Sequence, residues 1–270
     1  MDCHVSKIPV LLPTDDKAVY VVTGANRGIG LEHARQFLEK TNAHVVCTVR
    51  KTSAVHHLQA FRDQGRSDRL LVVELDTTDE SSIQAAAEQV DKAYPQGIDV
   101  LLNNAGNQEA LCRAVETSGA DYTAILAANV VGPFLVTKHF LPLLMKKNTR
   151  VVVNSSSICG SISATVSGGI GGENPLASVL LPYNTSKAAL NMQTAVLAND
   201  LKDDGFTIIS LHPGWVRTDM GHASQAFDGG TSQPPLDVLT SVAGQRKVIL
   251  GLSQKQNGMF LNWNGEKLDW

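Results

Sequence analysis

The chain alternates short apolar segments with longer amphipathic ones, and this alternation restricts its possible folds more than any other feature. Apolar runs such as AVYVVTG (18–24), AHVVCTVR (43–50) and RVVVNSSS (150–157) are rich in valine and lack a regular polar alternation. Strands of this kind are buried on both faces, as in a parallel sheet that is covered by helices. Repeated β-then-α units favour right-handed crossovers, so the pattern predicts an α/β fold with a doubly wound parallel sheet.

The expected elements form one series along the 270 residues, a length that suits a single domain spanning 1–270 with an N-terminal extension at 1–17. We expect about seven strands, at 18–24, 43–50, 69–76, 98–106, 150–157, 206–214 and 258–263. Helices are expected between them, at 28–40, from 51 to about 64, and at 80–94, 121–146, 183–202 and 236–253. Pro133 and Pro142 should make the helix at 121–146 irregular.

The charge balance and the cysteine pattern argue against several classes of protein. The 23 Lys and Arg against 26 Asp and Glu give a net charge of −3 without a basic block, so we expect no nucleic-acid partner and no anionic membrane surface. The four cysteines form no CxxC pair, and His56 and His57 have no partner at ligand spacing, so we expect no metal site. Reduced thiols suit a cytoplasmic protein. No apolar segment is expected to approach the ~20 residues of a membrane span.

The stretch TGANRGIG (23–30) places Gly24, Gly28 and Gly30 between the first strand and the first helix. Glycine allows a tight turn and a close approach of the backbone to a ligand. The helix N-terminus then offers free N–H groups to a pyrophosphate, and a strand before and a helix after are the context that a dinucleotide site requires. The alternative is a tight strand–helix turn without a ligand.

Tyr183 and Lys187 lie four residues apart at the start of a predicted helix, so they share one face. A phenol has an unperturbed pKa of about 10, and a nearby ammonium lowers that pKa. Such a phenol is able to donate a proton when a ketone is reduced and to accept one in the reverse direction. The alternative is an ordinary amphipathic helix with a core Tyr and a solvated Lys.

Taken together, four motifs resemble those of the short-chain dehydrogenase/reductase family: TGANRGIG, NNAG (103–106), the Ser…YxxxK set and HPGWVRTDM (212–220). The ending QNGMFLNWNGEKLDW is most similar to the branch of sniffer-like carbonyl reductases and C-factor proteins. The resemblance extends from about Val19 to the C-terminus. It implies a Rossmann-like fold, a nicotinamide cofactor and hydride transfer to or from a small molecule.

The resemblance also implies the catalytic residues. Ser157, three residues before Gly160, matches the serine that stabilises charge on the substrate oxygen, although Ser156 remains an alternative. Tyr183 is expected to be the proton donor, and Lys187 to bind the nicotinamide ribose as well. Asn129 matches a helix asparagine that holds a water between the lysine and solvent. The alternative for Asn129 is a buried amide that bonds the backbone at a helix irregularity.

Two arginines predict the cofactor NADP(H). The second strand ends in Val49 and then Arg50, so no carboxylate is available for the ribose hydroxyls that NAD enzymes bind at this place. A guanidinium pairs well with a 2′-phosphate, and Arg27 in the glycine turn is a second cation within reach. The alternative for both is a solvated surface arginine.

The remaining expected cofactor contacts come from the glycine turn and from the ends of later strands. Asp76 matches the acid that binds adenine, with a helix cap or turn acid as its alternative, and Asn103 is as much structural as binding. In full, these contacts are Asn26, Ile29, Asp76, Thr77, Asn103, Ala105, Gly106, Pro213, Gly214, Val216 and Thr218.

Two variable segments are expected to shape the substrate opening. Ser157 and Tyr183 are 26 positions apart, more than in many members of the family, which predicts an insertion loop at 161–181. It either shapes the pocket, obstructs the usual assembly surface or is simply tolerated. The segment 215–235 has the composition of a lid. Its Trp215 either stacks on an aromatic substrate or packs within the lid.

The sequence therefore predicts an NADPH-dependent carbonyl reductase that acts on a small ketone or aldehyde. One alternative is an NAD-linked secondary alcohol dehydrogenase, against which Arg50 argues. Another is a non-catalytic NADP-binding regulatory protein, against which the complete set of Ser157, Tyr183 and Lys187 argues. A homodimer or a homotetramer is possible.

Overall fold

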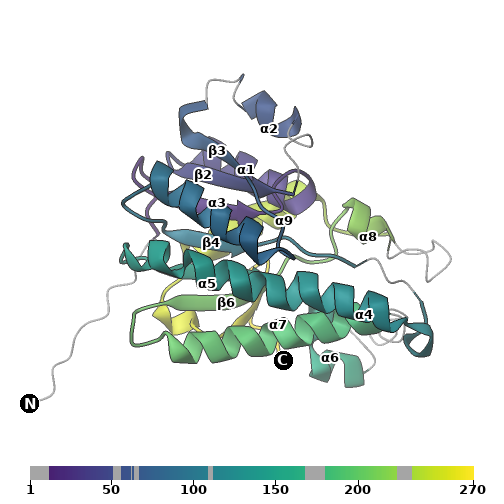
Figure 1. Ribbon diagram of the computed structural model, residues 1–270. Coiled ribbons are helices and arrows are strands. Elements are labelled where there is room, and N and C mark those ends of the chain that lie inside the picture. The colour runs from purple at the N-terminus through teal and green to yellow at the C-terminus, as the bar shows by residue number, and fades with distance from the viewer. Residues whose placement is uncertain are drawn as a thin grey trace, which may run out of the picture.

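The computed structural model describes residues 12–50, 56–61, 63, 67–108, 112–167, 180–223 and 233–270. These residues form one parallel sheet between two layers of helices (Figure 1). Most of the expected N-terminal extension (1–11), much of the insertion loop (168–179) and the middle of the expected lid (224–232) lie outside the described residues.

The sheet has seven strands in the order β3-β2-β1-β4-β5-β6-β7, and every neighbouring pair is parallel. Their bounds are β1 Val19–Thr23, β2 His44–Val49, β3 Leu70–Glu74, β4 Val100–Asn103, β5 Val151–Ser155, β6 Thr207–His212 and β7 Phe260–Asn262. The predicted doubly wound, Rossmann-like parallel sheet is therefore confirmed. The strand order reverses between β1 and β4, and such a switch point is where open α/β sheets bind ligands.

The central strands face two apolar cores, which explains their unbroken apolar runs. Tyr20 and Val22 of β1 join one core, whereas Val19 and Val21 join the other. Successive side chains of a strand point to opposite faces, so a central strand needs an apolar residue at each position.

The helices divide into two layers accordingly (Figure 1). The helices α1 (Gly28–Lys40), α2 (His56–Phe61) and α9 (Val238–Leu250) contribute to the first core. The helices α3 (Glu80–Ala93), α5 (Gly132–Met145) and α7 (Leu181–Asp200) contribute to the second. Three shorter helices lie toward the carboxyl ends of the strands: α4 (Gly119–Leu126), α6 (Ile162–Val166) and α8 (Asp219–Ala223). Four 3-10 turns complete the described elements: Ser67–Arg69, Ala114–Glu116, Ile158–Gly160 and Gln254–Gln256.

The helix expected at 121–146 is interrupted. A π turn at Ala127–Val131 (η5) joins α4 to α5, and α5 tolerates Pro142 in its interior. The described part of the insertion loop also contains the short helix α6, which its lack of periodicity did not predict.

The expectation that no apolar segment approaches 20 residues is wrong. The continuous helical stretch Gly119–Met145 has 27 residues and is apolar enough to cross a membrane by length and composition. Burial explains part of this apolar character, because Val136, Phe140 and Leu144 of this stretch are fully buried in the core beside the sheet.

A buried polar chain ties the sheet to α7. Asn103 Nδ2 donates to Asn154 Oδ1 at 2.9 Å, Asn154 Nδ2 donates to Thr194 Oγ1 at 2.9 Å, and Ser210 Oγ donates to the same oxygen at 3.0 Å. Polar groups buried in this way cost stability unless they are paired. These hydrogen bonds therefore fix the positions of β4, β5 and β6 relative to α7.

We expect Asn154→Ala to lower the free energy of unfolding by about 2 kcal/mol, because it leaves the buried donor of Asn103 without its partner. Urea denaturation measures this change. The exposed Asn199→Ala on α7 is the control, with an expected effect within about 0.5 kcal/mol. Equal effects of the two substitutions would contradict a structural role for the chain.

Candidate active site

The glycine turn lies at the switch point, between β1 and α1. Gly24 and Gly28 have φ angles of 65° and 55°, a left-handed conformation that favours glycine. A Cβ on Gly30 would lie 2.4 Å from the carbonyl oxygen of Gly24, so any side chain there would displace the turn. The predicted tight turn is therefore present, with the glycines where the backbone needs them.

Thr23 fastens the NNAG loop to this turn. Its Oγ1 accepts hydrogen bonds from the N–H groups of Asn104, at 2.9 Å, and Ala105, at 3.0 Å. Asn104 Nδ2 in turn donates to the carbonyl of Thr23 at 2.8 Å. Neither Thr23 nor Asn104 is among the predicted site residues, although both lie within the predicted motifs.

The N-terminus of α1 is open to an anion. Arg27 occupies the N-cap without a side-chain hydrogen bond to the helix, and the first turn holds no acidic residue. The first N–H groups of a helix lack partners within it and attract negative charge. The turn that contains Asn26 and Ile29 is thus suited to a phosphate group.

The two predicted phosphate-binding arginines differ. Arg27 Nη1 forms an ion pair with Asp219 at 2.8 Å, and both side chains are largely exposed. Arg50, directly after β2, is exposed and makes no hydrogen bond or ion pair within the described residues. Exposed ion pairs are weak, so an anion competes readily with Asp219. Arg50, in contrast, has no ion pair within the described residues that an anion would have to replace.

Asp76 and Thr77 shape the turn between β3 and α3. Asp76 Oδ1 accepts hydrogen bonds from both the N–H and the hydroxyl of Thr78, at 2.9 and 2.7 Å. Thr77 packs against α5, where a Cβ on Gly132 would lie 2.7 Å from its carbonyl oxygen. The carboxylate of Asp76 thus stabilises this turn, which is the alternative role given for it from the sequence. The N-terminus of α3 is capped by Asp79.

The NNAG residues point in different directions. The side chain of Asn103 is buried and donates to Asn154 and to Thr137, which makes it part of the sheet interior. Ala105 packs on the glycine turn, because a Cβ on Gly24 would lie 3.0 Å from its Cα. Gly106 faces the predicted catalytic residues Asn129 and Lys187, since a Cβ there would lie 3.3 Å from Asn129 Oδ1 and 3.6 Å from Lys187 Nζ.

The serine turn after β5 packs directly on α7. Ser157 caps the 3-10 turn Ile158–Gly160, its Oγ accepting from the N–H of Cys159 at 3.2 Å. A Cβ on Gly160 would lie 2.5 Å from the carbonyl carbon of Lys187. Glycine therefore lets this turn touch the backbone of the catalytic helix, which gives the Ser–x–x–Gly spacing a physical reason.

The structure distinguishes Ser157 from Ser156. Ser156 Oγ donates to Asn191 Oδ1 at 2.6 Å and is buried beneath the site. Ser157 instead lies near the Tyr183 phenol, and its hydroxyl acts to lower the pKa of that phenol.

Lys187 is a buried cation, with 6% of its surface exposed. Its Nζ donates to the carbonyl of Ser155 at 2.8 Å and lies 5.6 Å from the centre of the Tyr183 ring. Burial lowers the pKa of Lys187 from its ordinary 10.5 to about 8.

The pKa of Tyr183 is raised rather than lowered. Burial is the largest cause and the nearby Cys159 adds to it, while the Ser157 hydroxyl opposes both. The expectation that Lys187 acidifies the phenol is therefore wrong. The ammonium lies over the ring instead of bonding to the hydroxyl, so desolvation prevails. The phenol is held in its proton-donating form.

Asn129 lies in the π turn and connects three segments. Its Nδ2 donates to the carbonyl of Asn107 at 2.8 Å and to Ser186 Oγ at 3.0 Å, while its Oδ1 accepts from the N–H of Asn107 at 2.8 Å. Ser186 Oγ donates onward to the carbonyl of Tyr183 at 2.7 Å. The amide of Asn129 is thus buried and bonds the backbone at a helix irregularity, which agrees with the alternative given for it from the sequence. Through Ser186 it also connects to α7.

The segment after β6 faces the glycine turn. A Cβ on Gly28 would lie 3.6 Å from the Thr218 methyl group, and Val216 pairs with Leu236 in an isolated parallel bridge. Trp215 Nε1 donates to the carbonyl of Gly221 at 3.0 Å, which ties the indole to this segment. Pro213 and Gly214 form the turn between β6 and these residues.

The chain matches the short chain dehydrogenase family over residues 18–228. The chain belongs to this family. It is 35% identical over 255 residues to an uncharacterized oxidoreductase of Schizosaccharomyces pombe, covering 92% of this chain and 96% of that protein. It is also 35% identical over 173 residues to the C-signal protein of Myxococcus xanthus, covering 64% and 93%.

Solved structures of similar proteins include two carbonyl reductases. The NADPH-bound carbonyl reductase from chicken fatty liver has a TM-score of 0.82 and 33% identity, covering 94% of this chain and 99% of that one. Carbonyl reductase Sniffer of D. melanogaster has a TM-score of 0.79 and 30% identity, with the same coverage. The predicted resemblance to the short-chain dehydrogenases, and to their sniffer and C-factor branch, is confirmed.

The described part of this short-chain dehydrogenase holds no group of three His, Cys, Asp or Glu side chains arranged for a metal ion. Cys47, Cys112 and Cys159 are free thiols. Burial raises the pKa of Cys47 and of Cys159, so both thiols are held in the protonated form.

We expect Lys187→Met to stabilise the dehydrogenase at pH 7 and to lose much of this advantage as the pH rises. The folded pKa of about 8 lies below the ordinary 10.5, so the penalty for burying the ammonium is complete below pH 8 and disappears toward pH 10.5. Urea denaturation at pH 7 and pH 10 should show the difference between variant and wild type shrink by roughly 2–3 kcal/mol. The exposed Lys202→Met is the control. Parallel pH profiles would contradict a buried, charged Lys187.

Proposed function

We propose that this protein is an NADPH-dependent carbonyl reductase that reduces a ketone or an aldehyde, with Tyr183 as proton donor. The observation that carries the proposal is the convergence of Ser157, Tyr183 and Lys187 at the carboxyl end of β5, beside the glycine turn. The family contributes the reaction class, and the similarity to two solved carbonyl reductases supports the substrate class.

The residues around the switch point fit NADP(H). The glycine turn and the N-terminus of α1 suit the pyrophosphate. Arg50, whose guanidinium is unpaired among the residues that the structure describes, lies directly after β2, where a 2′-phosphate would require a cation. The chicken carbonyl reductase, which is similar over nearly its whole length, was solved with NADPH bound.

The chain's own groups account for the chemistry at the carbonyl oxygen. When it is bound, the reduced nicotinamide supplies the hydride. Tyr183 Oη donates the proton, and Ser157 Oγ donates a hydrogen bond to the same oxygen. Lys187 keeps a positive charge close to the phenolate that remains, at a pKa near the working pH. The raised pKa of Tyr183 keeps the donor protonated until it is needed.

Gly106 supports the proposed role of Asn129 in returning a proton to Tyr183. A Cβ on Gly106 would lie 3.3 Å from Asn129 Oδ1 and 3.6 Å from Lys187 Nζ, so this glycine brings the main chain close to both groups. In the proposed role a water joins Asn129 to Lys187, while the amide itself is held by Asn107 and Ser186.

Self-association into a homodimer or homotetramer is part of the proposal. Exposed apolar side chains lie on η5, α5 and α7, namely Val131, Phe134, Met192 and Val196, with 42–66% of their surfaces exposed. Apolar surface of this kind favours contact with another protein surface.

We expect Tyr183→Phe to lower kcat by roughly 10²–10⁴-fold, because it removes the proton donor. NADPH should still bind, which fluorescence titration measures directly. Tyr94→Phe is the matched control, since Tyr94 lies at the far end of α3 and contacts His44. Near-normal turnover of Tyr183→Phe with a panel of carbonyl compounds would refute the role of Tyr183.

We expect kcat/KM to be higher with NADPH than with NADH. Arg50→Ala should lower the value for NADPH by roughly 10–100-fold, the scale of a lost charge-assisted contact, and leave the value for NADH nearly unchanged. The exposed Lys202→Ala, which also removes one positive charge, is the control. A wild-type preference for NADH would instead favour the NAD-linked alcohol dehydrogenase.

A further inference from the structure

Three buried polar side chains connect α1 to the turn after β6. His33 Nε2 lies 3.1 Å from Gln245 Oε1, Gln245 Nε2 lies 2.9 Å from Ser241 Oγ, and Ser241 Oγ lies 2.6 Å from the carbonyl oxygen of Pro213. Each of the three side chains is at most 2% exposed. Gln245 and Ser241 belong to α9, so the chain of contacts crosses from one helix through another to the strand edge.

The bond to the Pro213 carbonyl fixes which group donates in each of the other hydrogen bonds of this series. The Pro213 carbonyl only accepts, so Ser241 must donate its single proton there. Ser241 then accepts from the Gln245 amide nitrogen, which leaves the Gln245 oxygen facing His33. His33 must therefore donate from Nε2, and its Nδ1 has no partner within the described residues. Burial lowers the pKa of His33 to about 4, so the ring is neutral with its proton on Nε2.

The Pro213–Gly214 turn, at which this series of hydrogen bonds ends, also packs closely against two side chains. Gly214 has a φ of 85°, and a Cβ there would lie 2.8 Å from Leu236 and 3.1 Å from Trp263. Trp263 packs equally closely on α9, where a Cβ on Gly244 would lie 2.4 Å from its ring. The turn is therefore enclosed by side chains, with Ser241 as the hydrogen-bonding contact.

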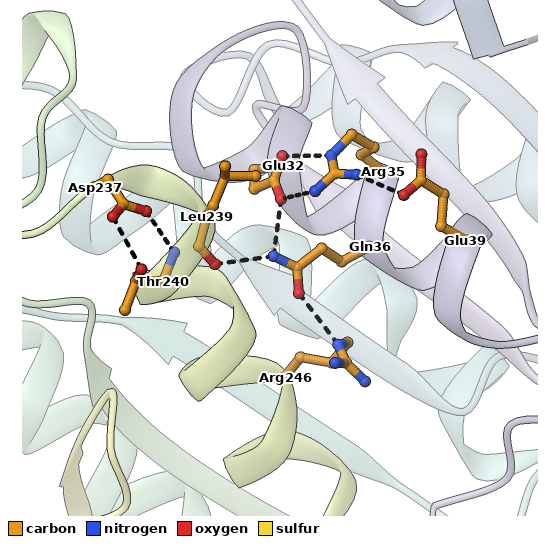
Figure 2. Close-up of polar contacts among 8 residues, drawn as sticks. All are labelled: Glu32, Arg35, Gln36, Glu39, Asp237, Leu239, Thr240 and Arg246. Carbon is orange, nitrogen blue, oxygen red and sulfur yellow. Dashed lines mark hydrogen bonds and ion pairs between the residues drawn. The ribbon is translucent and has the colours of Figure 1, made fainter.

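A second polar cluster holds α9 against α1 (Figure 2). Gln36 Nε2 donates to Glu32 Oε1 at 2.8 Å and to the carbonyl of Leu239 at 3.1 Å, and Arg246 Nε donates to Gln36 Oε1 at 3.2 Å. These contacts lie on either side of Ser241 along α9. They restrict how far the helix, and with it the Ser241 hydroxyl, is able to move.

We propose that Ser241, supported by Gln245 and His33, is a positioning residue that fixes the Pro213–Gly214 turn for the nicotinamide half of the cofactor. This inference rests on the proposed function. The resemblance to the short-chain dehydrogenases implies that the Pro213–Gly214 turn lines the nicotinamide. The turn follows β6 at the carboxyl edge of the sheet, and the segment after it faces the glycine turn at Gly28. The helix α1 thus offers its N-terminus to the pyrophosphate and, through His33, also supports this turn.

Hydrogen exchange tests the anchor without any cofactor. Ser241→Ala should speed amide exchange in a peptide covering 213–218 by about tenfold, the equivalent of one lost hydrogen bond. The matched control is Thr240→Ala, which removes a neighbouring hydroxyl of α9 that bonds only to Asp237. Gln245→Leu should act on 213–218 in the same direction. Unchanged exchange in this segment for Ser241→Ala and Gln245→Leu would overturn the proposal.

Kinetics then separate positioning from general stability. With Ser241→Ala, kcat should fall roughly three- to thirtyfold, since small misplacements of reacting groups are costly. The affinity for 2′-phospho-ADP-ribose, which lacks nicotinamide, should be unchanged. A parallel loss of that affinity would overturn the positioning role. If the wild type reduces no carbonyl compound with NADPH, the proposed function fails, whereas the exchange result still decides whether Ser241 anchors the turn.

Discussion

The contact between Gly160 and the backbone of Lys187 is the constraint on which the catalytic arrangement depends. Because a Cβ at this position would lie 2.5 Å from a backbone carbon, only glycine lets the end of β5 meet α7. The same contact brings Ser157 to the Tyr183 phenol and the carbonyl of Ser155 to Lys187. A strand end and a helix that are separated by a long insertion thus become one rigid site, which agrees with the view that catalytic groups are best held on regular elements.

Burial shifts the pKa values of Lys187 and Tyr183 in opposite directions, and both shifts suit the proposed reaction. Desolvation disfavours the charged form of each group, so the pKa of the lysine falls and that of the tyrosine rises. A neutral phenol is a competent proton donor, and a lysine with a pKa of about 8 exchanges protons near neutral pH. The protein accepts a loss of stability for this arrangement, as is common where a site needs groups in unusual protonation states.

Much of the fold and of the site could be predicted because the relevant signals are local. The apolar runs of the strands reflect burial on two faces, and the glycine turn and the Tyr183–Lys187 pair depend on spacing within a single segment. An irregularity in the helix at 121–146 was expected from Pro133 and Pro142, but its form, a π turn at Ala127–Val131, was not. The short helix α6 was missed, because it leaves no apolar periodicity in the sequence. The contacts of Thr23, Asn104 and Ser186 were missed for another reason. They join segments that are distant in the sequence.

By itself, the sequence determined the parallel α/β sheet and the place of the glycine turn, since each follows from residue types at fixed short spacing. The sequence also predicted a catalytic set that includes Tyr183 and Lys187, which share one helical face. Only the tertiary structure decided that Ser157 rather than Ser156 lies near the phenol, and that Asn103 faces the interior. It also decided that Arg27 pairs with Asp219, whereas Arg50 has no ion pair within the described residues. The reason is physical. The direction of a side chain and the solvation of its charge depend on neighbours that packing brings from other segments, and spacing along one segment does not specify them.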